Sequence, residues 1–138
     1  MSVLEWQRHD IIWTPNSYTA NSVEEVLNVA VGDLVGLIIC RTTTAFDGTG
    51  TAAKFELGDD GDADRYVDDG ELEETSVSAA TSIIRAAGAS GGGYVLYRSH
   101  LYTTANTIDV NFTAATGADG TTGAVQISIW VAHNIWLQ

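Results

Sequence analysis

The chain has 138 residues, of which 45% are apolar and 17% are charged, a composition typical of a packed domain and not of a disordered or coiled-coil segment. Eighteen Asp and Glu against six Lys and Arg give a formal net charge of −12. Such a charge repels nucleic-acid phosphates and anionic membranes, so neither is expected as a partner. No signal-peptide pattern or membrane-length apolar run is evident, which predicts a soluble, unexported protein with one domain over residues 1–138.

The N-terminal half predicts four strands. Residues 3–13 and 23–31 have strand-like patterns, and a continuous apolar segment follows from Leu34 to Cys40. After Asp47-Gly48-Thr49, the pattern resumes at residues 53–57, so we expect these two segments to form a deeply buried hairpin. Cys40 is the chain's one cysteine, which predicts a buried thiol and excludes an internal disulfide.

The C-terminal half predicts a further hairpin. A strand is expected at residues 94–102, and Ile108, Val110 and Phe112 then alternate with polar residues. The same alternation returns at residues 125–131 after a Gly- and Thr-rich loop. Both predicted hairpin loops contain Asp-Gly-Thr, at 47–49 and 119–121, which we interpret as ordinary turn chemistry and not as a duplicated hairpin.

Together these segments predict an all-β fold. Seven or eight short strands with Gly-rich turns and a single proline indicate one β-sandwich domain, with the jelly roll as the favoured topology. Residues 75–87 fit one face of a helix and one face of a strand equally well, so at most one short helix is expected.

An acidic tract extends from Glu56 to Glu74. Carboxylates fall at positions one, three, five and twelve of a calcium loop, at Asp60, Asp62, Asp64 and Glu71. Arg65 stands at position six, where the sharp turn of an EF-hand requires glycine. Calcium is therefore the one cofactor considered, and a solvated acidic loop in which Arg65 pairs with nearby carboxylates is the favoured alternative.

The sequence does not predict an enzyme. Gly88-Ala89-Ser90-Gly91-Gly92 matches the spelling of a nucleophile elbow, but a glycine run and a strand follow the serine where the elbow needs a helix. His9, His100 and His133 are far apart and have no metal-ligand spacing. No nucleophile, base and orienting partner can be named together.

Four tryptophans lie near the two ends of the chain, at Trp6, Trp13, Trp130 and Trp136. Trp130 occupies the polar phase of its strand, and an outward tryptophan is either covered by a neighbouring segment or placed at an interface. Two interpretations are open: packing of the C-terminal strand against the N-terminal strand, or contact between subunits through residues 1–13 and 130–138.

Several segments resemble those of small virion structural proteins of tailed bacteriophages. They are Thr44-Ala45-Phe46-Asp47-Gly48-Thr49, Phe55-Glu56-Leu57-Gly58, Gly61-Asp62-Ala63-Asp64-Arg65-Tyr66, Asn106-Thr107-Ile108 and the closing strand at residues 123–129. The resemblance covers roughly residues 40–132 and carries no catalytic motif. It implies a β-sandwich or jelly-roll subunit, often a homotrimer, that decorates the capsid or joins the head-to-tail or tail assembly.

The resulting hypothesis is a capsid decoration protein located in the virion. Its partners would be its own copies and the major capsid protein or other virion proteins, and it would reinforce the phage head by binding the assembled shell. Two alternatives stay open: another head-tail or tail component, and a carbohydrate- or receptor-binding β-sandwich module that uses exposed aromatic residues.

Overall fold

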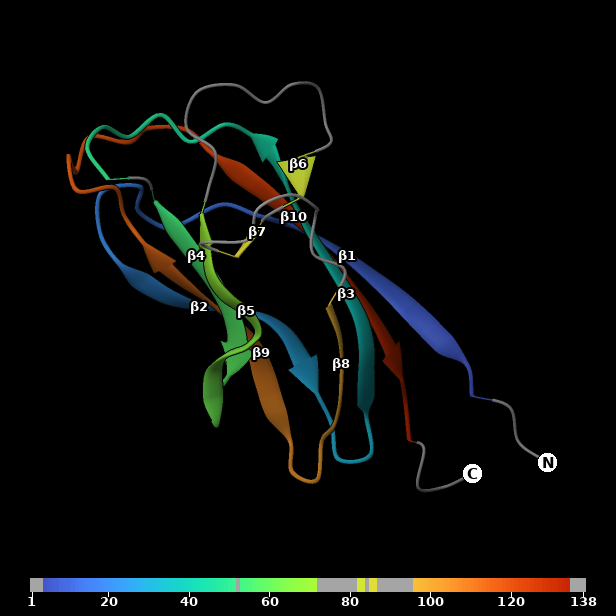
Figure 1. The fold of residues 1–138 in the computed structure, drawn as a ribbon. Coiled ribbons are helices and arrows are strands. Elements are labelled where there is room, and N and C mark those ends of the chain that lie inside the picture. Colours follow the sequence, from blue (N-terminus) through green and yellow to red (C-terminus); the bar gives the residue numbers. More distant parts are fainter. Residues whose placement is uncertain (1–3, 52, 72–81, 84, 87–95, 135–138) are drawn as a thin grey trace.

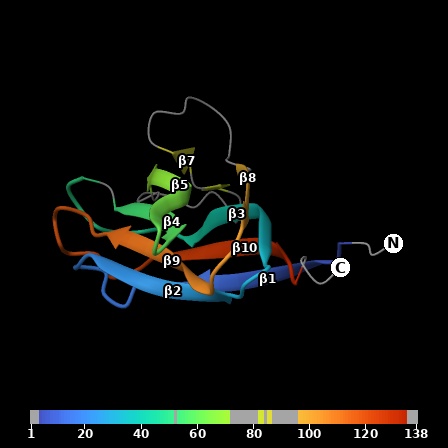
Figure 2. The same ribbon diagram turned by 90° about the horizontal axis from the view of Figure 1, so that it is seen from below.

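The computed structural model describes residues 4–51, 53–71, 82–83, 85–86 and 96–134. These residues form two antiparallel sheets packed face to face, as Figures 1 and 2 show, and the predicted β-sandwich is confirmed. The described residues contain strands and no helix. Of the segment at 75–87, which fits a helix or a strand, the described residues are two short strands, and the remainder lies outside the described residues.

Each sheet has four main strands and one two-residue strand among the described residues. Sheet A contains β1 (Trp6–Trp13), β10 (Ala124–Ala132), β3 (Leu34–Thr44), β8 (Leu96–Leu101) and the short β6 (Ser82–Ile83). Sheet B contains β2 (Ser22–Val29), β9 (Asn106–Thr113), β4 (Lys54–Asp59), β5 (Asp62–Glu71) and the short β7 (Arg85–Ala86).

The strand order is that of a jelly roll. Sheet A has the main-strand order β1-β10-β3-β8, and sheet B has the order β2-β9-β4-β5. Only β4 and β5 are both neighbours in sequence and partners in one sheet; the other described strands lie in the opposite sheet from the strand before them. This alternation between two sheets is the double Greek key by which jelly rolls are built.

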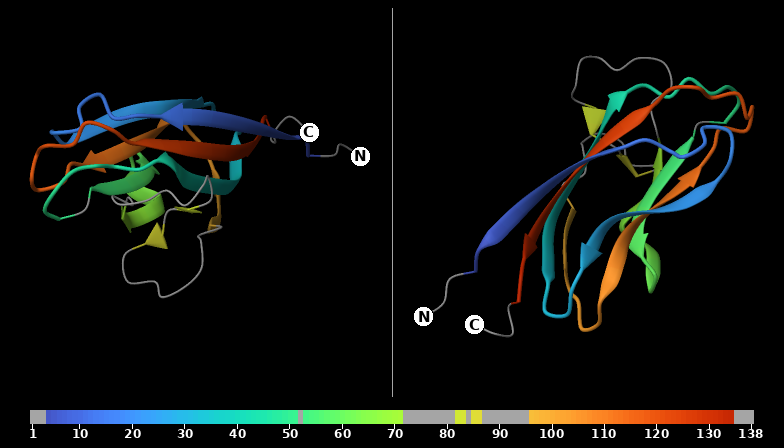
Figure 3. Two further views of the ribbon diagram at one scale, coloured as in Figure 1. Left: turned by 90° about the horizontal axis from the view of Figure 1, so that it is seen from above. Right: turned by 180° about the vertical axis from the view of Figure 1, so that it is seen from behind.

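Both predicted hairpins are wrong in their pairing. β3 and β4 lie in different sheets, and so do β9 and β10. Each predicted pair of strands is instead a crossover, with its loop passing from one sheet to the other at the same end of the sandwich (Figure 3). Alternating burial shows which face of a strand is covered, but it does not identify the neighbouring strand.

The core lies between the two sheets. Along β10, Val125, Ile127, Ile129 and Val131 point inward and are fully buried, as the period-two pattern predicts. The rings of Trp13, Phe46, Phe55 and Phe112 form an aromatic cluster in which the Trp13 centroid lies 5.5 Å from Phe55 and 5.6 Å from Phe112. This cluster joins strands of both sheets, so it fixes how the sheets face each other.

Candidate interaction surface

The outer face of sheet A is defined by the side chains that point away from the core. Trp6 and Arg8 on β1 alternate with inward residues, and Trp130 does the same on β10, where it lies opposite Arg8. Trp6 is 44% exposed, a high value for so large an apolar ring. The outward-facing positions of these strands, which are usually polar, therefore hold large aromatic side chains that the fold does not fully bury.

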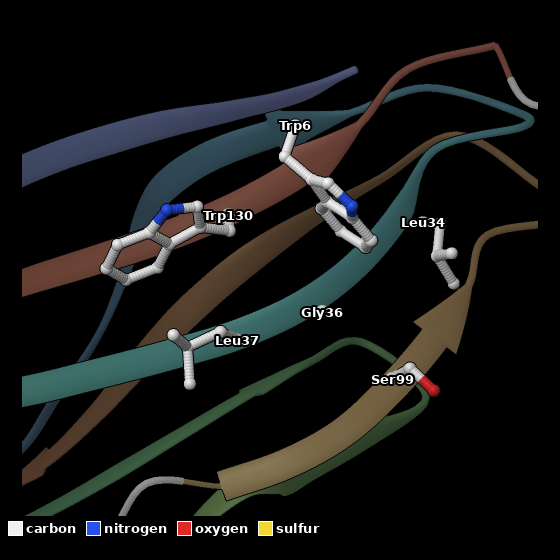
Figure 4. Close-up of a pocket in the computed structure, with 6 residues that line it drawn as sticks. All are labelled: Trp6, Leu34, Gly36, Leu37, Ser99 and Trp130. Atoms are coloured by element: carbon white, nitrogen blue, oxygen red, sulfur yellow. The ribbon is translucent and has the colours of Figure 1, made fainter. Parts of the chain in front are cut away.

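These aromatic groups surround an apolar hollow on the outer face. It has a volume of about 520 Å³ and is lined by Trp6, Leu34, Gly36, Leu37, Ser99 and Trp130 (Figure 4). The lining residues come from β1, β3, β8 and β10, so the hollow spans the width of sheet A. Apart from the indole N–H groups of the two tryptophans, the Ser99 hydroxyl is the one polar side-chain group in the lining, so the hollow is suited to apolar groups of a partner.

Gly36 allows the indole of Trp6 to lie close to β3. A Cβ atom at this position would lie 2.7 Å from the Trp6 ring, which no side chain tolerates without movement. The Arg8 guanidinium lies 5.2 Å from the centre of the Trp130 ring, in cation–π contact. The missing side chain at Gly36 thus makes room for Trp6 at the hollow, and the cation–π contact with Arg8 holds Trp130 there.

Beyond the hollow, the same face carries polar side chains paired within β1 and between neighbouring strands. Arg8 Nε donates to Asp10 Oδ1 at 2.8 Å, and Ser128 Oγ donates to the same carboxylate oxygen at 2.6 Å. The hydrogen bond from Ser128, followed by that from Arg8, lowers the pKa of Asp10. Further along, Arg41 Nε donates to Gln126 Oε1 at 2.8 Å. An apolar hollow beside polar groups and two arginines is the composition of many protein interfaces.

The four tryptophans predicted at an interface fall in three places. Trp6 and Trp130 lie together at the hollow, although 124 positions separate them in the sequence. Trp13 is 4% exposed and packs within the core, where its Nε1 donates to Glu24 at 2.8 Å. Trp136 lies outside the described residues. The contact role of the terminal strands stays a prediction, now focused on Trp6 and Trp130.

The acidic tract is largely a hairpin and not a loop. Strands β4 and β5 pair around a tight turn at Asp60 and Gly61, so Asp62, Asp64 and Glu71 follow one another along a single strand. The hydrogen bond with Asp62 raises the pKa of Asp64, and repulsion from Asp62 and Asp68 adds to this effect. Within the described residues, no three His, Cys, Asp or Glu side chains are grouped to hold a metal. Calcium binding stays an untested prediction.

One aspartate of the acidic tract belongs to a buried network that the sequence does not predict. The side chain of Asp59 is 1% exposed and accepts hydrogen bonds from Arg65 Nε at 2.6 Å and from Tyr102 Oη at 2.9 Å. Tyr66 Oη lies 2.8 Å from Tyr102 Oη. Burial raises the pKa of Asp59, but the hydrogen bonds from Arg65 and Tyr102 outweigh this effect and lower it. Burial also raises the pKa of Tyr66 to about 12.

A second cluster joins the two crossover loops. Asp47 accepts hydrogen bonds from the backbone of Thr121 at 2.6 Å and Thr122 at 2.9 Å, and from the Thr121 hydroxyl at 2.5 Å. Asp119 reciprocally accepts from the Thr49 backbone at 2.8 Å and hydroxyl at 2.6 Å. The two Asp-Gly-Thr segments therefore bind each other. We call this pair of loops the Asp-Gly-Thr clasp.

The histidines contact acids, an arginine and each other. The rings of His9 and His133 are 5.8 Å apart, and His133 Nδ1 lies 2.9 Å from Oδ1 of the buried Asp33. His100 Nδ1 lies 3.3 Å from Arg65 Nη1. Ser90 and the glycines around it lie outside the described residues. These contacts tie loops to strands and do not assemble a nucleophile with a base.

Other features of the sequence have a defined place in the fold. Cys40 is a free, buried cysteine, as predicted, and burial raises the pKa of its thiol to about 12. In the part of the chain that the structure describes, no helix has the length and apolar character needed to cross a membrane.

Comparison with solved structures places this jelly roll beside capsid proteins of phages. No family model matches the sequence, and no curated protein matches it significantly. A chain of the acidic stable capsid structure of Helicobacter pylori bacteriophage KHP30 aligns with 96% of this chain and 91% of its own length, with a TM-score of 0.63 and 9% identity. A chain of the cyanophage Pam1 capsid asymmetric unit aligns with 94% of this chain and 84% of its own length, with a TM-score of 0.58 and 16% identity.

Proposed function

We propose that the chain is a non-enzymatic structural protein of a phage virion, and within that class a capsid decoration protein. The observation that carries the proposal is the likeness of almost the whole chain to two phage capsid chains. The resemblance of residues 44–49 and of the closing strand to small virion proteins supports the same class. A homotrimer that docks on the major capsid protein is the form of assembly that this resemblance implies.

The outer face of sheet A is the docking surface in this proposal. Trp6 and Trp130 offer large rigid side chains at an apolar hollow, and Arg8 covers the Trp130 ring. Tryptophan and arginine are the residue types most enriched among those that dominate binding energy at interfaces. Because docking stabilises only the assembled shell, the protein reinforces the particle by mass action and without chemistry.

The test is co-sedimentation of the purified protein with phage particles that lack it. Trp6→Asp and Trp130→Asp place a charge in the hollow and should each reduce particle binding at least about tenfold, since a hot-spot aromatic contributes roughly 2 kcal/mol or more. Val23→Asp is the matched control, because Val23 is 69% exposed on sheet B. Wild-type protein that does not bind the particles would contradict the proposal. If the wild type binds and the two tryptophan variants bind as well as Val23→Asp, the hollow is not the docking surface.

A carbohydrate-binding module is the second candidate, because two tryptophans beside a hollow can stack on sugar rings. The lining argues against it. Leu34, Leu37 and Gly36 offer no side-chain hydrogen bonds, so the sugar hydroxyls would be oriented only by the Ser99 hydroxyl and the indole N–H groups of the two tryptophans. A glycan-array signal that Trp130→Asp abolishes would favour this second function.

A further inference from the structure

The edge of sheet A offers a second interaction surface, which lies beside the hollow and shares Trp6 with it. β1 is the last strand on its side of sheet A, and among the described residues β10 is the one strand that pairs with it (Figure 1). Within the part of the chain that the structure describes, the backbone N–H and C=O groups on the other edge of β1 therefore have no strand partner. An uncovered edge strand is a template for pairing with another strand, and proteins guard such edges with charge, proline or bulges.

β1 has no proline, no bulge and no net formal charge to guard its edge. Its eight residues, Trp6 to Trp13, contain one arginine and one aspartate, so the strand is electrically neutral in a chain of net charge −12. Its pairing with β10 is continuous, without a bulge, and it contains no proline. The corresponding edge strand of sheet B differs, because β2 carries Glu24 and Glu25 with no cation. Repulsion disfavours pairing of β2 with its own copy, and no such barrier exists for β1.

The outward side chains of β1 are complementary to themselves. From one end to the other they are Trp6, Arg8, Asp10 and Ile12, an apolar, a cationic, an anionic and an apolar group. Trp6 is 44% exposed and Ile12 is 63% exposed, and they lie at equal distances in sequence on either side of His9. If two copies of β1 pair antiparallel about His9, each Arg8 lies opposite Asp10 of the other copy and each Trp6 lies opposite Ile12.

We propose that two copies of this chain associate across a two-fold axis through β1, with His9 at the axis. The contact would join the two A sheets into one continuous sheet and would place Trp6 of each copy beside Ile12 of the other on the outer face. The proposal rests on the proposed function, because it specifies how copies associate in a virion. In the joined sheet both hollows lie on one face, so a pair of copies could dock together; in a homotrimer, the free β1 edges would link neighbouring trimers.

Charge variants test the register directly. Arg8→Asp leaves two acids on β1, and Asp10→Arg leaves two arginines, so each variant alone sets like charges opposite each other. Each should self-associate at least about tenfold more weakly than the wild type, because two opposed pairs become repulsive. An equimolar mixture of the two variants should recover association, since every acid then faces an arginine. Sedimentation equilibrium over a range of concentrations measures all three samples.

Asp60→Arg is the matched control for Asp10→Arg, because it makes the same change in charge at the exposed turn between β4 and β5, away from β1, and should leave association unchanged. Circular dichroism confirms that each variant is folded. Failure of the mixture to associate, or wild-type association that neither variant weakens, would overturn the proposal. This result is independent of the particle test. If the wild type binds particles but its self-association does not change in the charge variants, the proposed function stands and the two-fold contact through β1 is wrong.

Discussion

Two clusters centred on carboxylates tie the sandwich together, and they differ in their access to water. Asp59 is buried with Arg65, Tyr66 and Tyr102, whereas Asp47 and Asp119 in the Asp-Gly-Thr clasp are exposed. Both clusters lower the pKa of their aspartates through hydrogen bonds. A buried polar network left half-satisfied costs far more than an exposed one, because water cannot replace the lost partner.

The largest effect is expected from the buried cluster. Asp59→Ala removes the buried carboxylate that accepts from Arg65 and Tyr102. Arg65 then keeps its contact with His100 and Tyr102 its contact with Tyr66, but the guanidinium loses its anion. We expect a loss of about 3 kcal/mol in the free energy of unfolding, measured by urea denaturation, which is the usual cost of breaking a buried charged pair. A decrease of less than about 1 kcal/mol in the free energy of unfolding would mean that water solvates the groups around Asp59. The buried and the exposed cluster would then not differ in their access to water.

A smaller effect is expected from the clasp. Asp47→Ala and Asp119→Ala each remove the acceptor of one Asp-Gly-Thr pair, and each should lower the Tm less than Asp59→Ala does, since water solvates the released groups. Because both halves join the same two loops, the double variant should lower the Tm by less than the sum of the single changes. Asn21→Ala is a control outside the clasp, since Asn21 Oδ1 accepts a hydrogen bond from the backbone of Ala114. Additive effects of the two aspartate variants would show that the halves act independently.

The smallest effect is the dependence of the clasp on acid. Hydrogen bonds from Thr121 and Thr122 lower the pKa of Asp47 from 3.8 to about 2. Its contribution to stability is therefore complete above about pH 4 and is lost as the pH falls toward 2. The difference in Tm between wild type and Asp47→Ala should shrink over this range. A difference that stays constant down to pH 2 would contradict the role given to the charged form.

The sequence predicts which side chains of the candidate surface point outward, but not which of them lie next to each other. The polar phase of Trp130 indicates correctly that its side chain points outward, because residues alternate along a strand. That Trp6 lies beside it follows only from the pairing of β1 with β10, which brings the two ends of the chain together. Trp13, which has the same residue type, lies on the inward phase of β1 and belongs to the core.

The acidic tract shows a different limit. β5 is missing from the predicted strands because its sequence is dominated by aspartates, which are depleted in strands. Tertiary contacts override this preference: Tyr66 and Val67 are buried in the core, and Asp59 is neutralised by Arg65. The predicted pairing of Arg65 with a nearby carboxylate is confirmed, but that carboxylate is buried and not in a solvated loop.

The sequence by itself determines the class of fold, the positions of most strands, the faces that they bury and the acidic charge of the molecule, because these depend on local period and composition. The tertiary structure alone decides which strands are neighbours. In each of the two predicted hairpins the two strands lie in opposite sheets, and the Asp-Gly-Thr loops that connect them bind each other at one end of the sandwich. Pairing between distant segments depends on the packing of the whole core, which no local pattern contains.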